Sequence, residues 1–165
     1  MKQILRIFWL LAAAAAVLAL TACSSGPAEK DFTVAGLTIT LNEEFTETAS
    51  ERFDGCFFSV DTIVTVRRET DAMLADAGYT GTMTAQHYAE IAAGGNELDT
   101  EIRERDGLVC FDYDVPADGV SYHCLAVVLR SDDSFWLIHF MCAGELYPLN
   151  EAAYLEYAAS VTFAE

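Results

Sequence analysis

The chain has 165 residues, of which 26 are acidic and 9 are basic, so its formal net charge at pH 7 is −17. This excess of negative charge repels DNA, RNA and anionic lipid headgroups, which argues against any nucleic-acid-binding role. The length suits one domain, and more than half of the residues are hydrophobic, enough for a substantial core.

Residues 1–22 are predicted to be a lipoprotein signal peptide. Positive charge on Lys2 and Arg6 precedes an apolar run, residues 7–20, that is short for a membrane span but suits a signal-peptide core. The run ends in Leu20-Thr21-Ala22-Cys23. This tetrapeptide resembles the lipobox of bacterial lipoproteins, in which the cysteine is lipidated and becomes the mature N-terminus.

We therefore expect acyl chains, such as palmitate, on Cys23. Residues 23–31 are predicted to be a polar tether, and residues 32–165 a single globular α+β domain. The anchor would hold the protein at the extracytoplasmic face of the cell membrane, or at the outer membrane in a host that has one.

Strand patterns follow the tether. Residues 32–41 alternate apolar and polar side chains around Ala35-Gly36, which predicts a hairpin or a bent strand. The polar residues 42–52 are predicted to be a connection. The segment 57–67 is rich in β-branched and aromatic side chains, which favours one further strand.

Two helices are predicted, and residues 72–74 are also compatible with the start of a short one. The first of the two is capped by Thr84, runs through Ala93 and ends at Gly94-Gly95. The final helix follows Pro148 and is predicted to be capped by Asn150. Its buried side chains are predicted to be Tyr154, Tyr157, Ala158 and Val161.

Between these two helices lies a predicted three-stranded meander over residues 101–115, 121–130 and 135–142, with turns at residues 116–119 and 131–134. The last two strands are apolar on both faces and so need cover on both sides. The sequence thus predicts an α+β layered sandwich with a mainly antiparallel central sheet and helices on both faces.

Four stretches resemble a little-characterised family of small lipoproteins from anaerobic Gram-positive bacteria, related in fold to the Mog1/PsbP-like domains. They are residues 32–41, 106–114, 134–142 and 157–163. The resemblance implies a layered sandwich with an antiparallel sheet, and it implies no enzymatic activity. The better-known relatives bind other proteins, but no residues of those binding sites match here, so neither partner is carried over.

Four cysteines remain besides Cys23, and an even number in an exported chain allows two disulfides. Cross-strand pairs Cys110–Cys124 or Cys124–Cys142 are candidates. The alternative is that these residues and Cys56 pack as small hydrophobic side chains, because all four lie among apolar neighbours. A reactive thiol would need a nearby base, and Cys56 follows Asp54-Gly55 with no histidine close to it in the sequence.

Zinc-ligand side chains occur together at His123, Cys124, His139 and Cys142. Adjacent residues of a strand point to opposite faces, so His123 and Cys124 do not easily share one metal ion. We therefore predict no metal site.

Paired carboxylates at Asp112 with Asp114 and at Asp132 with Asp133 are of a type that can bind calcium or serve acid–base chemistry. So acidic a composition produces such pairs by itself, and we predict that they are solvated. Several aromatic side chains could line a pocket but are more typical of a core. They are Trp136, Tyr147, Tyr154 and Tyr157.

The sequence contains no glycine-rich phosphate loop, Gly-x-Ser-x-Gly elbow or His-Glu-x-x-His motif. We therefore predict a membrane-anchored, non-enzymatic binding or envelope-accessory protein with no cofactor. Its partners would be the membrane, through the lipid on Cys23, and an unidentified protein or small molecule. The alternative function is a thiol-redox or metal-binding protein that uses the other four cysteines.

Overall fold

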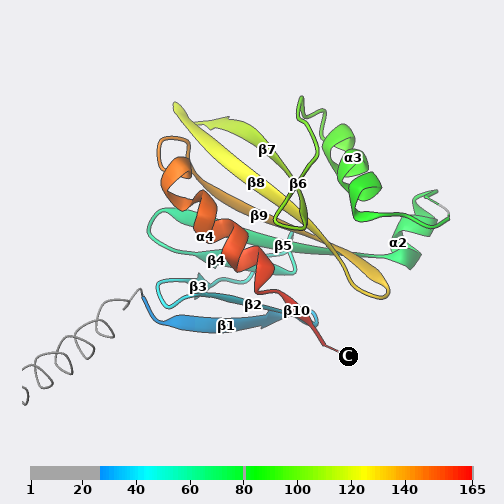
Figure 1. Cartoon of the computed structure of the whole chain (residues 1–165), viewed down its shortest axis with the longest axis horizontal. Helices are drawn as coiled ribbons and strands as arrows, with labels where there is room; N and C mark the ends of the chain where they lie inside the picture. Colours follow the sequence, from blue (N-terminus) through cyan, green and yellow to red (C-terminus); the bar gives the residue numbers. More distant parts are fainter. Residues whose placement is uncertain (1–26, 80, 165) are drawn as a thin grey trace, which may run out of the picture.

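The computed structural model describes residues 27–79 and 81–164, and in this part the chain forms two antiparallel sheets and three helices (Figure 1). The predicted signal peptide and Cys23 lie outside the described residues. The first strand, β1 (Glu29–Val34), begins inside the segment predicted to be the tether. No helix of the described ranges is long and apolar enough to cross a membrane.

The larger sheet has seven strands in the order β3-β4-β5-β9-β8-β7-β6, and every neighbouring pair is antiparallel. The predicted meander is confirmed, because β8 lies between β7 and β9 at the centre of this sheet. The strands are β3 (Thr46–Glu47), β4 (Gly55–Phe58), β5 (Thr62–Thr70), β6 (Arg103–Arg105), β7 (Leu108–Ala117), β8 (Val120–Arg130) and β9 (Ser134–Ala143).

The smaller sheet has the order β1-β2-β10, with β2 (Leu37–Asn42) in the middle and β10 (Thr162–Phe163) at one edge. The alternation predicted for this segment is confirmed: Leu37, Ile39 and Leu41 are fully buried. No sequence pattern predicted β10, which is only two residues long. It returns the end of the chain to the beginning of the domain (Figure 1).

Tight turns join the hairpins. Both residues have positive φ in Ala35-Gly36, Asp106-Gly107 and Asp118-Gly119, the geometry that matches the right-handed twist of paired strands. The turn at Asp106-Gly107 splits the segment predicted as one strand, residues 101–115, into β6 and β7. The predicted strand over residues 57–67 is likewise two strands, β4 and β5, which pair as a hairpin.

The helices are α2 (Asp71–Asp76), α3 (Ala85–Gly95) and α4 (Tyr147–Ala159). Thr84 caps α3 as predicted, since its Oγ1 accepts a hydrogen bond from the amide of His87 at 3.2 Å. The predicted stop at Gly94-Gly95 is wrong, because both glycines continue the helix. The predicted Asn150 cap is also wrong: Pro148 lies in the first turn, so α4 starts earlier and Asn150 is inside it.

The central strands are covered on both faces. Along β8, Leu125 and Val127 pack in one cluster with α4 and the smaller sheet, while Ala126 and Val128 pack in a second cluster with α3. Tyr88 of α3 stacks on Phe135 of β9 with 4.6 Å between ring centroids. The prediction of helices on both faces holds only in part: the molecule is mostly sheet, and α4 shares its face with three strands.

We predict that Leu125→Ala lowers the free energy of unfolding by about 3 kcal/mol, because the fully buried side chain leaves a cavity between β8 and α4. Val120→Ala in the same strand should change it by less than about 0.5 kcal/mol, since Val120 is 42% exposed. Urea unfolding of both variants measures the difference, and equal losses would contradict the position of the core.

Candidate functional site

A cavity of about 370 Å³ lies beside α3 on the face of the large sheet that carries Tyr113 and His139. We call it the α3 pocket. Phe111 and Leu137 also contribute to its wall from β7 and β9, and the C-terminal end of α3 contributes Asn96, which lies just after the helix. The lining has an apolar and aromatic part and a basic part, and it includes no acidic residue.

The basic part consists of Arg52 and Arg67. Arg67 lies on β5 directly opposite Leu137 of β9, so the sheet fixes its position. Arg52 lies in the loop between β3 and β4, where the Oγ of Ser50 accepts hydrogen bonds from the amides of Arg52 and Phe53 at 3.1 and 3.3 Å. This turn holds Arg52 and Phe53 at the pocket, where both are lining residues.

Four other arginines of the described residues pair with carboxylates. Their ion pairs are Arg68–Asp133, Arg103–Asp112, Arg105–Asp112, Arg105–Glu151 and Arg130–Asp71. Arg52 and Arg67 have no carboxylate oxygen within 4.0 Å in residues 27–79 and 81–164. The α3 pocket therefore carries positive charge that the described part of the chain does not neutralise.

His139 lines the same pocket as a neutral ring. Burial and then the nearby Arg67 charge lower the pKa of His139 to about 4. Its Nδ1 lies 3.4 Å from the Oγ1 of Thr65, and Tyr113 meets the ring edge-on with centroids 6.0 Å apart. A neutral imidazole has one nitrogen that donates and one that accepts, so His139 adds neutral hydrogen-bonding capacity.

We predict that His139 makes the fold less stable as pH falls. Its pKa is about 4 in the folded protein and about 6.5 when unfolded, so between these values the unfolded chain takes up a proton that the folded chain does not. His139→Asn should flatten the fall in stability between about pH 6.5 and 4, measured as urea midpoints across this range. His87→Asn, a change in an exposed histidine of α3, serves as the control. A slope for His139→Asn equal to that of the wild type would contradict the prediction.

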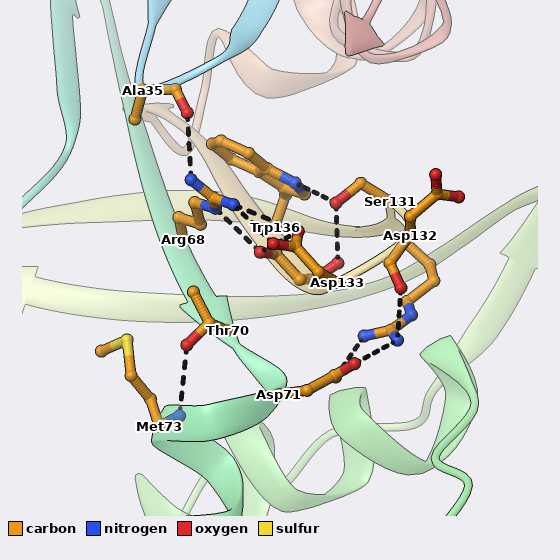
Figure 2. Close-up of polar contacts among 11 residues, drawn as sticks. Ala35, Arg68, Thr70, Asp71, Met73, Ser131, Asp132, Asp133 and Trp136 are labelled. Atoms are coloured by element: carbon orange, nitrogen blue, oxygen red, sulfur yellow. Dashed lines mark hydrogen bonds and ion pairs between the residues drawn. The ribbon is translucent and has the colours of Figure 1, made fainter. Parts of the chain in front are cut away.

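A second cavity, of about 500 Å³, lies at the turn between β8 and β9, and we call it the turn pocket. Figure 2 shows its polar network. Arg68 donates to both carboxylate oxygens of Asp133 and to the carbonyl oxygen of Ala35, so it ties the two sheets together. The Nε1 of Trp136 donates to the Oγ of Ser131 at 3.1 Å.

The second arginine of the turn pocket, Arg130, binds Asp71 through both guanidinium nitrogens at 2.6 and 2.8 Å. The hydrogen bond from Arg130 lowers the pKa of Asp71, and bonds from Ser134 and then Arg68 lower the pKa of Asp133. Asp133 is 69% exposed, in agreement with the prediction that it is solvated, and it also holds Arg68. Both arginines of this cavity are thus neutralised from within the fold, which indicates a structural role.

A third polar cluster surrounds Asp112, on the face covered by α4. Its side chain, only 9% exposed, accepts hydrogen bonds from Arg103, Arg105 and the hydroxyl of Tyr147. The prediction that Asp112 is solvated is therefore wrong.

His123 completes this third cluster. It lies against Tyr147, with ring centroids 3.9 Å apart, and its Nδ1 is 2.8 Å from Asp114. Asp112 joins Arg103, Arg105 and Tyr147, whereas the Nε2 of His123 is buried without a hydrogen-bond partner in the described residues, 3.6 Å from Asp112.

The zinc-ligand side chains do not come together. In the register of β8 and β9, His123 lies opposite Cys142, whereas Cys124 lies opposite Met141, so Cys124 projects from the other face. His139 is on the same face as Cys124 but lies opposite Ala126. No group of three or more metal-binding side chains occurs in the part of the chain that the structure describes.

All four described cysteines are buried and free. The candidate disulfides Cys110–Cys124 and Cys124–Cys142 are not formed, because each pair lies on opposite faces of the sheet. Cys110 and Cys142 share a face, but β8 lies between their strands and their partners on β8, Val127 and His123, are four residues apart. Two strand spacings of about 4.8 Å across the sheet and about 13 Å along it put them beyond the reach of a disulfide. Burial raises the pKa of Cys124 to about 12 and raises that of Cys56 and Cys110.

The aromatic side chains considered for a pocket mostly belong to the core. Trp136 and Tyr154 are buried, and Tyr147 and Tyr157 pack against the same cluster. Sequence analysis did not single out Arg52 or Arg67. The available signal was the scarcity of basic residues in an acidic chain, but only the fold shows which arginines lack a partner.

No known protein family matches the sequence, and no curated protein matches it closely. Solved structures are similar in fold. Cyanobacterial PsbP (CyanoP) from Synechocystis is 14% identical with a TM-score of 0.53, over 86% of this chain and 95% of its own. LpqN, described as involved in cell envelope biogenesis of Mycobacterium tuberculosis, is 11% identical with a TM-score of 0.50, over 84% of this chain and 91% of its own.

A protein from Bacteroides thetaiotaomicron is 9% identical with a TM-score of 0.53, over 84% of this chain but 49% of its own. The chain therefore has a PsbP-like fold, as the resemblance of its core stretches implied. Identities this low show the fold alone.

Proposed function

We propose that this chain is a lipid-anchored accessory protein of the cell envelope whose domain binds a ligand in the α3 pocket without catalysing a reaction. The lipobox-like segment ending at Cys23 supports the anchor. The fold is shared with LpqN, an envelope biogenesis protein, and this is compatible with a role at the envelope.

The observation that carries the binding function is the charge of the α3 pocket. Arg52 and Arg67 line it without a carboxylate within 4.0 Å in the described residues, whereas the arginines of the turn pocket are paired internally. A concave site with aromatic walls and a few uncompensated polar groups is the usual form of a ligand site.

The alternative, a thiol-redox protein, has less support. A redox-active cysteine needs an accessible thiolate, usually with a second thiol in reach. Cys124 is buried with its pKa raised to about 12, and its register places it away from the other thiols on β7 and β9. The metal-binding alternative meets the same obstacle, because the sheet separates the ligand types.

We predict that the four described cysteines resist iodoacetamide in the native protein at pH 8 and all react after unfolding in urea, because all four are buried. Peptide mapping by mass spectrometry reports each residue separately. Rapid labelling of Cys56 or Cys110 in the native protein would revive the thiol-redox alternative.

We predict that Cys23→Ala leaves the precursor uncleaved and without acyl chains, because the cysteine sulfur is the attachment point of the lipid. Intact mass of the protein recovered from membranes measures both changes. Ser24→Ala is the matched control and should be processed normally. A Cys23→Ala protein that is cleaved and membrane-bound like the wild type would contradict the anchor.

A further inference from the structure

We infer that the α3 pocket binds a small organic anion, with its carboxylate or phosphate group held by Arg52 and Arg67 and its apolar body against Phe53 and Tyr113. This inference rests on the proposed binding function and names the class of ligand.

Charge distribution is the first argument. Acidic residues outnumber basic ones by 26 to 9, so an exposed arginine on this chain has many carboxylates available as partners. Within the described ranges the ion pairs account for Arg68, Arg103, Arg105 and Arg130, and the two arginines without a pair line one cavity. An outside anion would supply the missing partner.

The nearest alternative partner along the strand is Glu69, which lies two residues beyond Arg67 and so on the same face of β5. Glu69 makes no ion pair with Arg67 within 4.0 Å in the described residues, and both charges act on Tyr88: burial and then Glu69 raise its pKa, and Arg67 lowers it. The carboxylate of Asp54, in the loop with Arg52, accepts a hydrogen bond from the amide of Arg68 at 2.7 Å. The neighbouring acids therefore have other contacts.

Preorganisation is the second argument. Arg67 projects from a strand paired on both sides, and the turn made by Ser50 fixes the backbone of Arg52. Both side chains are exposed, so an anion can reach them from solvent. Guanidinium groups bind carboxylates and phosphates through two parallel hydrogen bonds, and a fixed backbone reduces the entropy lost on binding.

The remaining lining fits an apolar or aromatic body. Phe111 and Leu137 are buried in the floor, and Phe53 and Tyr113 are half-buried at the wall. The volume of about 370 Å³ falls in the range of small-molecule sites and is too small for a folded partner. His139, with its pKa lowered to about 4, is neutral at pH 7 and offers hydrogen bonding without charge.

The test is binding of three probes to the full lipidated chain in nonionic detergent, with micelles alone as the blank, measured by saturation-transfer NMR and titration. The probes are indole-3-acetate, its neutral analogue indole-3-acetamide, and phenyl phosphate. We expect indole-3-acetate to bind about tenfold more tightly than the amide, because each charge-assisted contact is worth about that factor. Comparison with phenyl phosphate shows which anionic group the site prefers.

Variants locate the site. Arg52→Gln and Arg67→Gln should each weaken indole-3-acetate about tenfold while leaving the amide unchanged, and Arg67→Lys should restore part of the loss. Lys30→Gln removes the same charge from β1, away from the pocket, and should bind as the wild type. Unchanged urea midpoints verify that the variants fold.

Equal binding of acid and amide, or wild-type affinity in both Gln variants, would overturn the anionic ligand while leaving a pocket that binds neutral molecules. Failure of both anionic probes to bind would also overturn it. If the protein forms a dimer and Arg67→Gln dissociates it, the partner of Arg67 is an acidic surface of a second copy and not a small anion. The intact mass of Cys23→Ala tests the lipid anchor and thiol labelling tests the thiol-redox alternative, both without any ligand, so failure of the proposed function is distinguishable from failure of the anionic ligand.

Discussion

The structure depends on the need to cover β8 and β9 on both faces. Their side chains are apolar on each side, with Leu125 and Val127 facing one way and Ala126 and Val128 the other. An α-helix is about 10 Å across and strands are about 4.8 Å apart, so one helix covers about two strands. On one face α4 is supplemented by the smaller sheet, whereas on the other α3 lies over β7 and β8 with only the short α2 beside it. The α3 pocket lies where this cover ends, next to β5 and β9.

The few arginines of this acidic chain have different surroundings in the two cavities. In the turn pocket, Arg68 joins Asp133 to the backbone of Ala35, so the ion pair links the large sheet to the small one (Figure 2). Arg130 similarly attaches α2 through Asp71. These arginines use their charge inside the fold. In the α3 pocket the same side-chain type stands beside aromatic walls without such a partner in the described residues, and its charge remains available to a ligand.

The sequence predicted what local patterns determine. Segments that are apolar on both faces correctly predicted the meander, and the period-two alternation predicted the buried face of β2. Thr84 predicted the start of α3. The predictions that were wrong concern features that depend on contacts between residues distant in the chain. A shift of one residue in register moves a side chain to the other face, so the separation of Cys124 from Cys142 could not be derived from spacing. The burial of Asp112 requires α4 to fold over β7, and β10 exists only because β2 offers an edge.

The fold and the chemistry of the α3 pocket have separate origins. CyanoP and LpqN share this architecture at 14% and 11% identity, so the sheet is a scaffold that tolerates almost complete replacement of its side chains. In this chain α3 lies over β7 and β8, and the cavity opens beside it next to β5 and β9. The chemistry of that area comes from this chain alone: Arg52 from a loop, Arg67 from a strand, and Tyr113 from a third element. Because these residues share no local sequence signature, only the folded chain shows that they line one cavity and which class of ligand the cavity suits.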